Sequence, residues 1–348
     1  TITGTSVTSD GLVTNTLGTS NLRLGVNAGD SITSGGNYNT VVGDEAGTAI
    51  TTGDRNSAVG MSALVANTTG SFNAALGYES LKANTTGGQN TGLGDRTLLA
   101  NTTGALNTAV GQGSLAANTT ASNNVAVGVY ALEANTTGAS NTAVGQAALT
   151  DNTTGIVNVA IGYLALNSNT TAAYNVGIGY EALKFNTTGT NNVGIGKGAL
   201  EKNTTASNNT AVGWQALLAN TTGTLNVAVG TNALDANQTG SANTAVGYNA
   251  GSAFTSDGIT AFGKDALELC TTGLNTAVGA NALSSVTSNA GNTAVGQDAL
   301  TANTTANNTA VGAFALGANT TGTQNVAVGY GALDANTTAN NNTAVGRN

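Results

Sequence analysis

The chain has 348 residues, of which only 7% are charged and 4% are aromatic, and its formal net charge is −8. Nine lysines and arginines cannot form the basic stripe that neutralises a run of phosphates, so we expect no nucleic-acid partner. No apolar stretch approaches the length that spans a bilayer, so we expect no membrane insertion. The single cysteine, Cys270, excludes an internal disulfide.

In chain order, residues 1–24 are predicted to form a lead-in segment or N-terminal cap, and residues 25–348 form one repeat array. The repeated unit reads N-[TV]-A-[VI]-G-x-x-A-L-x-x-N-T-T-[GA]-x-x, and we number its positions 1 to 17 from the first Asn. Position 5 is glycine in about twenty copies, mostly 17 residues apart: Gly25, Gly43, Gly60, Gly77, Gly94, Gly111, Gly128, Gly145, Gly162, Gly179, Gly196, Gly213, Gly230, Gly247, Gly263, Gly279, Gly296, Gly312, Gly329 and Gly346.

A unit of this length is too short for a helical-hairpin repeat and suits one rung of a β-solenoid. The segment Asn-Thr-Ala-Val-Gly is short, β-branched and bounded by turn residues, while the frequent Gly, Asn and Thr disfavour helix. The sequence therefore predicts an all-β fold, a parallel β-solenoid of about twenty rungs. Glycine at position 5 is expected to adopt a backbone conformation closed to other residues, at a corner of the rung.

Two positions are predicted to form the core. Position 4 is Val, Ile, Leu or Phe in every copy and is interpreted as an inward ladder, as at Val144. Position 9 is Leu in most copies and Gly in three irregular ones, at Gly29, Gly47 and Gly251. Because strand side chains alternate, position 3, which is mostly Ala or Gly, would then face outward as a self-association stripe. The alternative is a flattened coil in which these alanines are the tight interior.

Asparagines at positions 1 and 12, such as Asn141 and Asn152, are predicted to stack in hydrogen-bonded ladders along the rungs. The Asn-Thr-Thr triplets also match the N-glycosylation pattern, but a turn ladder explains each of them. Charged residues lie at variable positions and are interpreted as solvent-facing corners. Four aromatic residues just after the position-5 glycine are the candidate surface contacts to sugars: Tyr130, Tyr163, Tyr180 and Trp214.

The unit NTAVGxxALxxNTTGxx resembles the head repeats of YadA-type trimeric autotransporter adhesins and, more closely, the 17-residue arrays of phage tail fibres. The segments Ser6-Val-Thr-Ser-Asp-Gly-Leu12 and Ser20-Asn-Leu-Arg-Leu-Gly25 are similar to those that precede such arrays. The resemblance covers essentially the whole chain. It implies a left-handed β-roll that assembles as a homotrimer or filament, acts as a spacer or adhesin, and lies outside the cell on a virion tail or bacterial surface. We expect the chain to be a portion of a longer fibre.

Enzymatic catalysis is not expected. Without histidine there is no Ser-His-Asp triad and no His zinc ligand, so no catalytic, cofactor or metal site is predicted. Carboxylates such as Asp44, Glu45 and Glu79 lie at corners without a further acidic cluster. The predicted function is a structural or adhesive fibre that contacts a glycan or receptor. The alternative is an ice-binding solenoid, which is opposed by adjacent threonines such as Thr153 and Thr154 that would face opposite sides of a strand.

Overall fold

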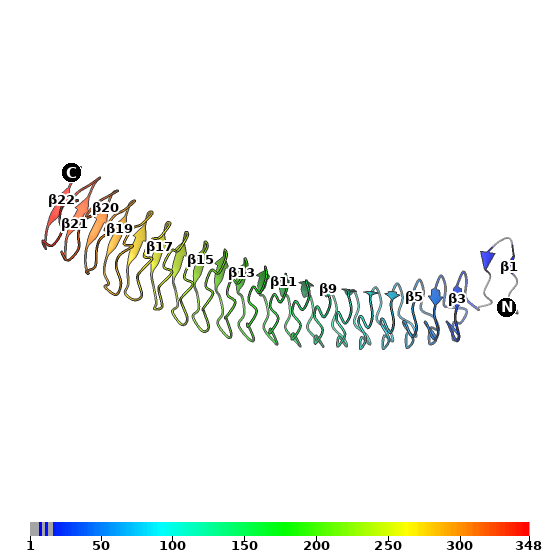
Figure 1. The fold of residues 1–348 in the computed structure, drawn as a ribbon. Helices are drawn as coiled ribbons and strands as arrows, with labels where there is room; N and C mark the ends of the chain where they lie inside the picture. Colours follow the sequence, from blue (N-terminus) through cyan, green and yellow to red (C-terminus); the bar gives the residue numbers. More distant parts are fainter. Residues whose placement is uncertain (1–6, 9–10, 13–16, 348) are drawn as a thin grey trace. The chain divides into compact units, whose positions relative to one another are not determined.

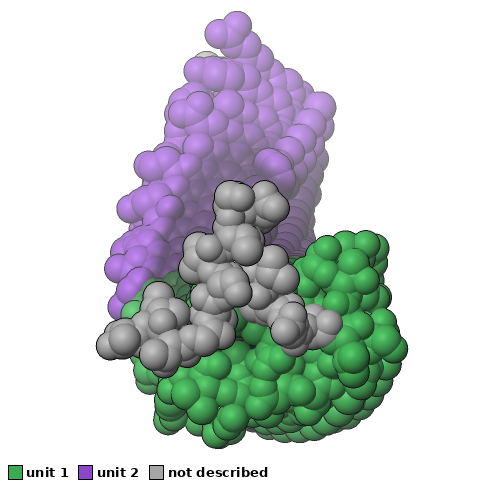
Figure 2. Space-filling view, turned by 90° about the vertical axis from the view of Figure 1, so that its right-hand side faces the viewer, with its two compact units in different colours: residues 1–172 green, residues 173–348 purple. Residues whose placement is uncertain are grey.

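The computed structural model describes residues 7–8, 11–12 and 17–347 and divides the chain into two compact units, Thr1–Ala172 and Ala173–Asn348 (Figure 2). Apart from a short antiparallel pair, β1 (Val7–Thr8) and β2 (Gly11–Leu12), each described strand belongs to one rung of a parallel β-solenoid (Figure 1). The predicted fold class is confirmed. No helix occurs among the described residues.

The rungs of each unit contribute one three-residue strand each. Unit 1 contains β3 (Leu22–Leu24), β4 (Thr40–Val42), β5 (Ser57–Val59), β6 (Ala74–Leu76), β7 (Thr91–Leu93), β8 (Thr108–Val110), β9 (Val125–Val127), β10 (Thr142–Val144) and β11 (Val159–Ile161). Unit 2 contains β12 (Val176–Ile178), β13 (Val193–Ile195), β14 (Thr210–Val212), β15 (Val227–Val229), β16 (Thr244–Val246), β17 (Thr260–Phe262), β18 (Thr276–Val278), β19 (Thr293–Val295), β20 (Thr309–Val311), β21 (Val326–Val328) and β22 (Thr343–Val345). Strand β3 lies inside the segment assigned from sequence to the lead-in.

Neighbouring strands pair in parallel and in register, so that each repeat position lies beside its own copy in the next rung. In β10, for example, Ala143 pairs with Ala126 of β9 and with Ala160 of β11. The returns between strands are also hydrogen-bonded from rung to rung: the Leu149 amide donates to the Ala165 carbonyl at 3.1 Å, and the Asp151 amide donates to the Asn167 carbonyl at 3.0 Å. The 17-residue period is therefore the structural rung.

The position-5 glycines turn the chain sharply after each strand, as predicted. Gly145 has a φ of 136°, a backbone angle that residues with a side chain rarely adopt. A Cβ atom at Gly145 would lie 2.5 Å from the carbonyl oxygen of Gly162 in the next rung. Other corners use left-handed backbone at non-glycine residues. Within one rung, Ala147, Leu149 and Val157 have φ angles of 55°, 52° and 56°. The rung-to-rung hydrogen bonds hold these residues in a conformation that is unfavourable for L-amino acids.

The interior of a regular rung contains the small residues of positions 3 and 8, mostly alanine, and the leucine of position 9. Ala143, Ala148 and Leu149 are fully buried, whereas Val144 at position 4 is only partly buried. The inward ladder predicted at position 4 is therefore wrong, and so is the outward alanine stripe at position 3. The alternative, in which the alanines are the tight interior, is confirmed. The rung is so narrow that only small residues fit opposite the leucine of position 9.

Rungs that lack the leucine compensate within the same rung. Where position 9 is Gly47, position 12 is Ile50 instead of asparagine and position 3 is Val41, and both side chains are fully buried. A Cβ atom on Gly47 would lie 2.7 Å from the ends of both side chains. Similarly, Phe254 is fully buried three residues after Gly251. The irregular copies thus keep the core filled, as close packing requires.

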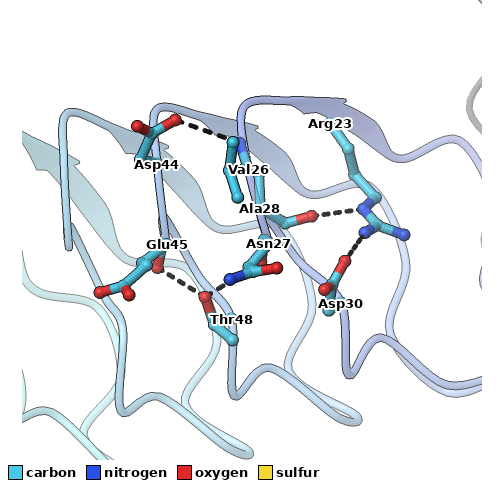
Figure 3. A network of polar contacts seen from close by, with 8 residues as sticks. All are labelled: Arg23, Val26, Asn27, Ala28, Asp30, Asp44, Glu45 and Thr48. Carbon is cyan, nitrogen blue, oxygen red and sulfur yellow. Dashed lines mark hydrogen bonds and ion pairs between the residues drawn. The ribbon is translucent and has the colours of Figure 1, made fainter.

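The first described rung combines Gly29 at position 9 with Arg23 at position 3. Figure 3 shows the contacts of Arg23. The Arg23 guanidinium is paired with Asp30 and donates to the Ala28 carbonyl. Beside it, the Val26 amide donates to Oδ1 of Asp44 at 3.1 Å. The arginine therefore takes the place of the position-3 alanine, while Ala28 at position 8 and Ile32 at position 12 remain buried.

Candidate functional site

Two ladders of asparagine side chains are buried along the rungs, as predicted. At position 1, the Asn158 amide donates to Oδ1 of Asn141 at 2.9 Å, and Nδ2 of Asn141 donates to the Gly155 carbonyl at 2.8 Å. At position 12, Nδ2 of Asn152 donates to Oδ1 of Asn135 at 2.8 Å. Asn152 and its copies from Asn67 to Asn237 are fully buried. The Asn-Thr-Thr triplets that begin at these asparagines are therefore not glycosylation acceptors in the folded protein. The chemistry open to partners lies on the outside.

The outer face of each strand carries positions 2 and 4. Since position 3 points inward, both of its neighbours point outward, and they form two parallel rows of mainly β-branched residues. Several of these side chains are more than a third exposed: Val59, Leu76, Leu93, Val125 and Ile161 in unit 1, and Ile195, Val227, Phe262, Val295, Val311, Val326 and Val328 in unit 2. We call the two rows the strand face. Each unit presents a strand face that is largely apolar.

The aromatic residues lie almost entirely outside the core, because the interior of a regular rung holds small residues, leucine and the asparagine ladders. Of the fourteen aromatic residues, only Phe254 is buried. The four candidates are all exposed, with Tyr130 and Tyr163 at 40%, Tyr180 at 47% and Trp214 at 45%. Tyr163, Tyr180 and Trp214 occupy position 6, whereas Tyr130 lies one residue later at position 7. Sequence reasoning missed Tyr248, which is also at position 6 and 50% exposed.

Several cationic side chains stack on exposed rings of a neighbouring rung. Nζ of Lys197 lies 5.5 Å from the ring centre of Tyr180, one rung away. Arg55 stands between two rings at position 17, at 5.5 Å from Tyr38 and 5.2 Å from Phe72. Each such contact stabilises the position of an exposed ring by about 1 kcal/mol or less.

A shallow groove of about 270 Å³ lies on the return segments of unit 2. Two of its residues, Asn232 and Asn249, directly follow position 6 of their rungs in the sequence. Its lining includes Asn232, Asp235, Asn249 and Glu268. Nδ2 of Asn232 donates to Oδ1 of Asn249 at 3.3 Å, but Oδ1 of Asn232 is shielded from solvent and accepts no hydrogen bond. Burial raises the pKa of the Asp235 carboxyl. The groove therefore combines carboxylates with an unsatisfied acceptor.

The remaining polar groups of the described residues include ion pairs and one buried thiol. No three His, Cys, Asp or Glu side chains in the described part of the chain gather in a group that would hold a metal ion. Glu79 is engaged by Lys82 and Arg96, and the hydrogen bond from Lys82 lowers the pKa of its carboxyl. Burial raises the pKa of the Cys270 thiol. Among the described residues, no helix has the length and apolar character needed to cross a membrane.

The threonines of the Asn-Thr-Thr triplets have different roles. Oγ1 of Thr153, at position 13, donates to the Thr170 carbonyl of the next rung at 3.1 Å. Thr154, at position 14, is exposed. The two threonines therefore do not form a paired outward array, in agreement with the objection raised from the sequence. An outward pair with one intervening residue exists instead on the strand face, for example Thr108 and Val110.

Neither a protein-family model nor a curated protein matches this chain.

Proposed function

We propose that this protein is a structural and adhesive element of an extracellular fibre, built by lateral self-association of its solenoid through the strand face. One observation carries the proposal: within each unit the strand face carries an unbroken row of partly exposed apolar side chains at position 4, and the core is complete without them. The interior is already filled by Ala143, Ala148 and Leu149, so the valines and isoleucines of position 4 contribute little to the rung itself. Contiguous exposed apolar surface of this kind marks an interaction site.

The strand face suits a second copy of the same chain. Both rows repeat with the rung spacing, about 4.8 Å, so an identical rod that lies parallel presents side chains at the same intervals. Few charged side chains interrupt the rows, which keeps desolvation costs low. A homotrimer, in which each strand face packs against two others, would remove these residues from water. The resemblance to trimeric fibre repeats supports the same assembly.

The test is the mass of the assembly in solution. Light scattering after size exclusion is expected to give three times the 33.7 kDa chain mass. Replacing Val110 and Val144 together by Asp is expected to yield monomers with an unchanged β-sheet circular dichroism spectrum. The matched control replaces the exposed Thr120 and Thr154 by Asp, which adds the same charge at another corner and leaves the assembly intact. A wild-type monomer at micromolar concentration, or equal dissociation of the control, would refute the proposal.

A second candidate function, ice binding, is favoured by one feature of the same face. The outward residues of positions 2 and 4, such as Thr108 and Val110, form a regular array of hydroxyl and methyl groups. Ice binding requires this face to be open to water, whereas the fibre covers it. A monomer that shows thermal hysteresis, lost in the Val110→Asp and Val144→Asp variant, would favour ice binding. A trimer without thermal hysteresis would exclude it.

A further inference from the structure

One row of exposed aromatic residues in unit 2 has a regular spacing. Tyr180, Trp214 and Tyr248 all occupy position 6, and consecutive members are 34 residues, or two rungs, apart. Their exposures of 45–50% leave ring surface open to solvent. The intervening rungs carry Lys197 and Thr231 at this position. We call these five residues the aromatic row.

The spacing of the row matches a linear polymer. Two rungs advance by about 9.6 Å, which is close to the length of one disaccharide in an extended β-1,4-linked hexopyranose chain. Every second sugar of such a chain presents the same face to the same side. Aromatic rings offer flat apolar surfaces on which the C–H face of a sugar ring stacks. Tyr180, Trp214 and Tyr248 are therefore placed to contact alternate sugars.

The groove beside the row supplies polar groups of the kind that bind sugar hydroxyls. Asn232 follows Thr231, and Asn249 follows Tyr248, so the groove borders the row in the chain. The carboxamides of Asn232 and Asn249 line the groove and are hydrogen-bonded to each other, which orders them beside the row. Asp235 and Glu268 would accept hydrogen bonds from sugar hydroxyls, and their negative charge would repel a carboxylated or sulfated chain. The polar groups thus favour a neutral glycan.

We propose that the aromatic row and its groove bind a neutral, linear β-1,4-linked glycan that lies along the rungs of unit 2. The proposal deepens the adhesive part of the proposed function by naming the ligand class, and it rests on that function. The row spans four rung steps, about 19 Å. A pentasaccharide is therefore the shortest chain that reaches all three rings.

The experiment is isothermal titration calorimetry of the full chain with cello-oligosaccharides and chito-oligosaccharides of three to six sugars. Affinity for at least one of the two series is expected to rise up to the pentasaccharide and to change little for the hexasaccharide. Maltohexaose, which has α-1,4 linkages, is the matched ligand control and is expected not to bind. Absence of binding by both series at millimolar concentration, or equal binding of maltohexaose, would overturn the proposal.

Variants test the row itself. Trp214→Ala is expected to lower the association constant for the hexasaccharide by about tenfold, as loss of a buried aromatic contact does in many interfaces. Tyr78→Ala is the matched control, because Tyr78 occupies position 6 in unit 1 and is 39% exposed, but has Asp44 and Gln112 two rungs away. It is expected to bind as the wild type.

The spacing is tested by a swap that keeps the composition. Lys197→Trp combined with Trp214→Lys places the tryptophan one rung from Tyr180 and three from Tyr248. Binding is expected to fall as far as in Trp214→Ala. Undiminished binding of the swap would show that the two-rung spacing is irrelevant. Light scattering on the same samples reports self-association separately, so loss of glycan binding with an intact trimer contradicts only the ligand assignment.

Discussion

The asparagine ladder at position 1 allows a quantitative prediction, for the substitution Asn141→Leu. The change removes three hydrogen bonds: two to Oδ1, from the Asn158 amide at 2.9 Å and from Nδ2 of Asn158 at 3.2 Å, and one from Nδ2 to the Gly155 carbonyl at 2.8 Å. The Gly155 carbonyl keeps Nδ2 of Asn152 at 3.1 Å, and Nδ2 of Asn158 keeps the Ala172 carbonyl. The main loss is at the buried Asn158 amide, which donates to Oδ1 of Asn141 in the native protein.

The cost follows from this count. Removing the acceptor of a buried amide costs about 1–3 kcal/mol, and the other lost bonds add roughly 1 kcal/mol. We therefore expect opening of this rung to become easier by about 2–4 kcal/mol, while rungs farther along the unit stay protected because each contacts only its neighbours. The control Thr154→Val, at an exposed position, is expected to change little.

Hydrogen exchange followed by mass spectrometry measures this effect for each peptide. Faster exchange is expected in peptides that contain β10 and β11, with unchanged exchange near β5. Two results would refute the reasoning. Equal exchange in Asn141→Leu and Thr154→Val would mean that the ladder contributes nothing, and faster exchange throughout the unit would mean that the rungs unfold as one globular core.

Other predictions concern the core and the period. Ala143→Glu places a charge in the filled interior and is expected to cause proteolytic cleavage near β10, whereas equal resistance to protease would contradict the burial of position 3. Gly47→Leu alone is expected to lower the melting temperature, and a second change, Ile50→Asn, to restore part of it; lack of rescue would show that the two positions do not share volume. Deleting residues 141–157 is expected to leave a folded protein, while deleting eight of them is not; equal behaviour of both deletions in circular dichroism would contradict the rung. Cys270 is expected to react slowly with iodoacetamide in the native protein, because burial raises its thiol pKa, and rapid alkylation would contradict that burial.

The period, the corner glycines and the asparagine ladders could be predicted because each repeats at a fixed spacing and has one structural explanation. The inward face of the strand could not be settled in the same way. Alternation places Ala143 and Val144 on opposite sides but does not say which side is inside. Assigning the larger residue to the core gave the wrong answer, because the leucine of position 9 already fills the rung.

A signal for the correct assignment is present in the sequence. Position 3 is Ala or Gly in every copy except Arg23 and Val41, whereas position 4 varies from Val to Phe262. A packed interior does not tolerate such a change in volume, so a position that varies in this way is expected to face solvent. By contrast, no sequence signal indicates left-handed backbone at Leu149, because leucine rarely adopts it. That conformation results from the rung-to-rung hydrogen bonds.

The division between inside and outside also limits what kind of ligand this protein can acquire. Inner positions repeat because each must match its copy in the next rung, while position 6 varies from Asp95 to Trp214 without disturbing them. A contact surface can therefore change one rung at a time, but its elements can be spaced only by whole rungs of about 4.8 Å. A globular ligand gains little from that regularity. A linear polymer whose own repeat is close to a multiple of the rung gains a further contact with each added unit, until its length exceeds the row.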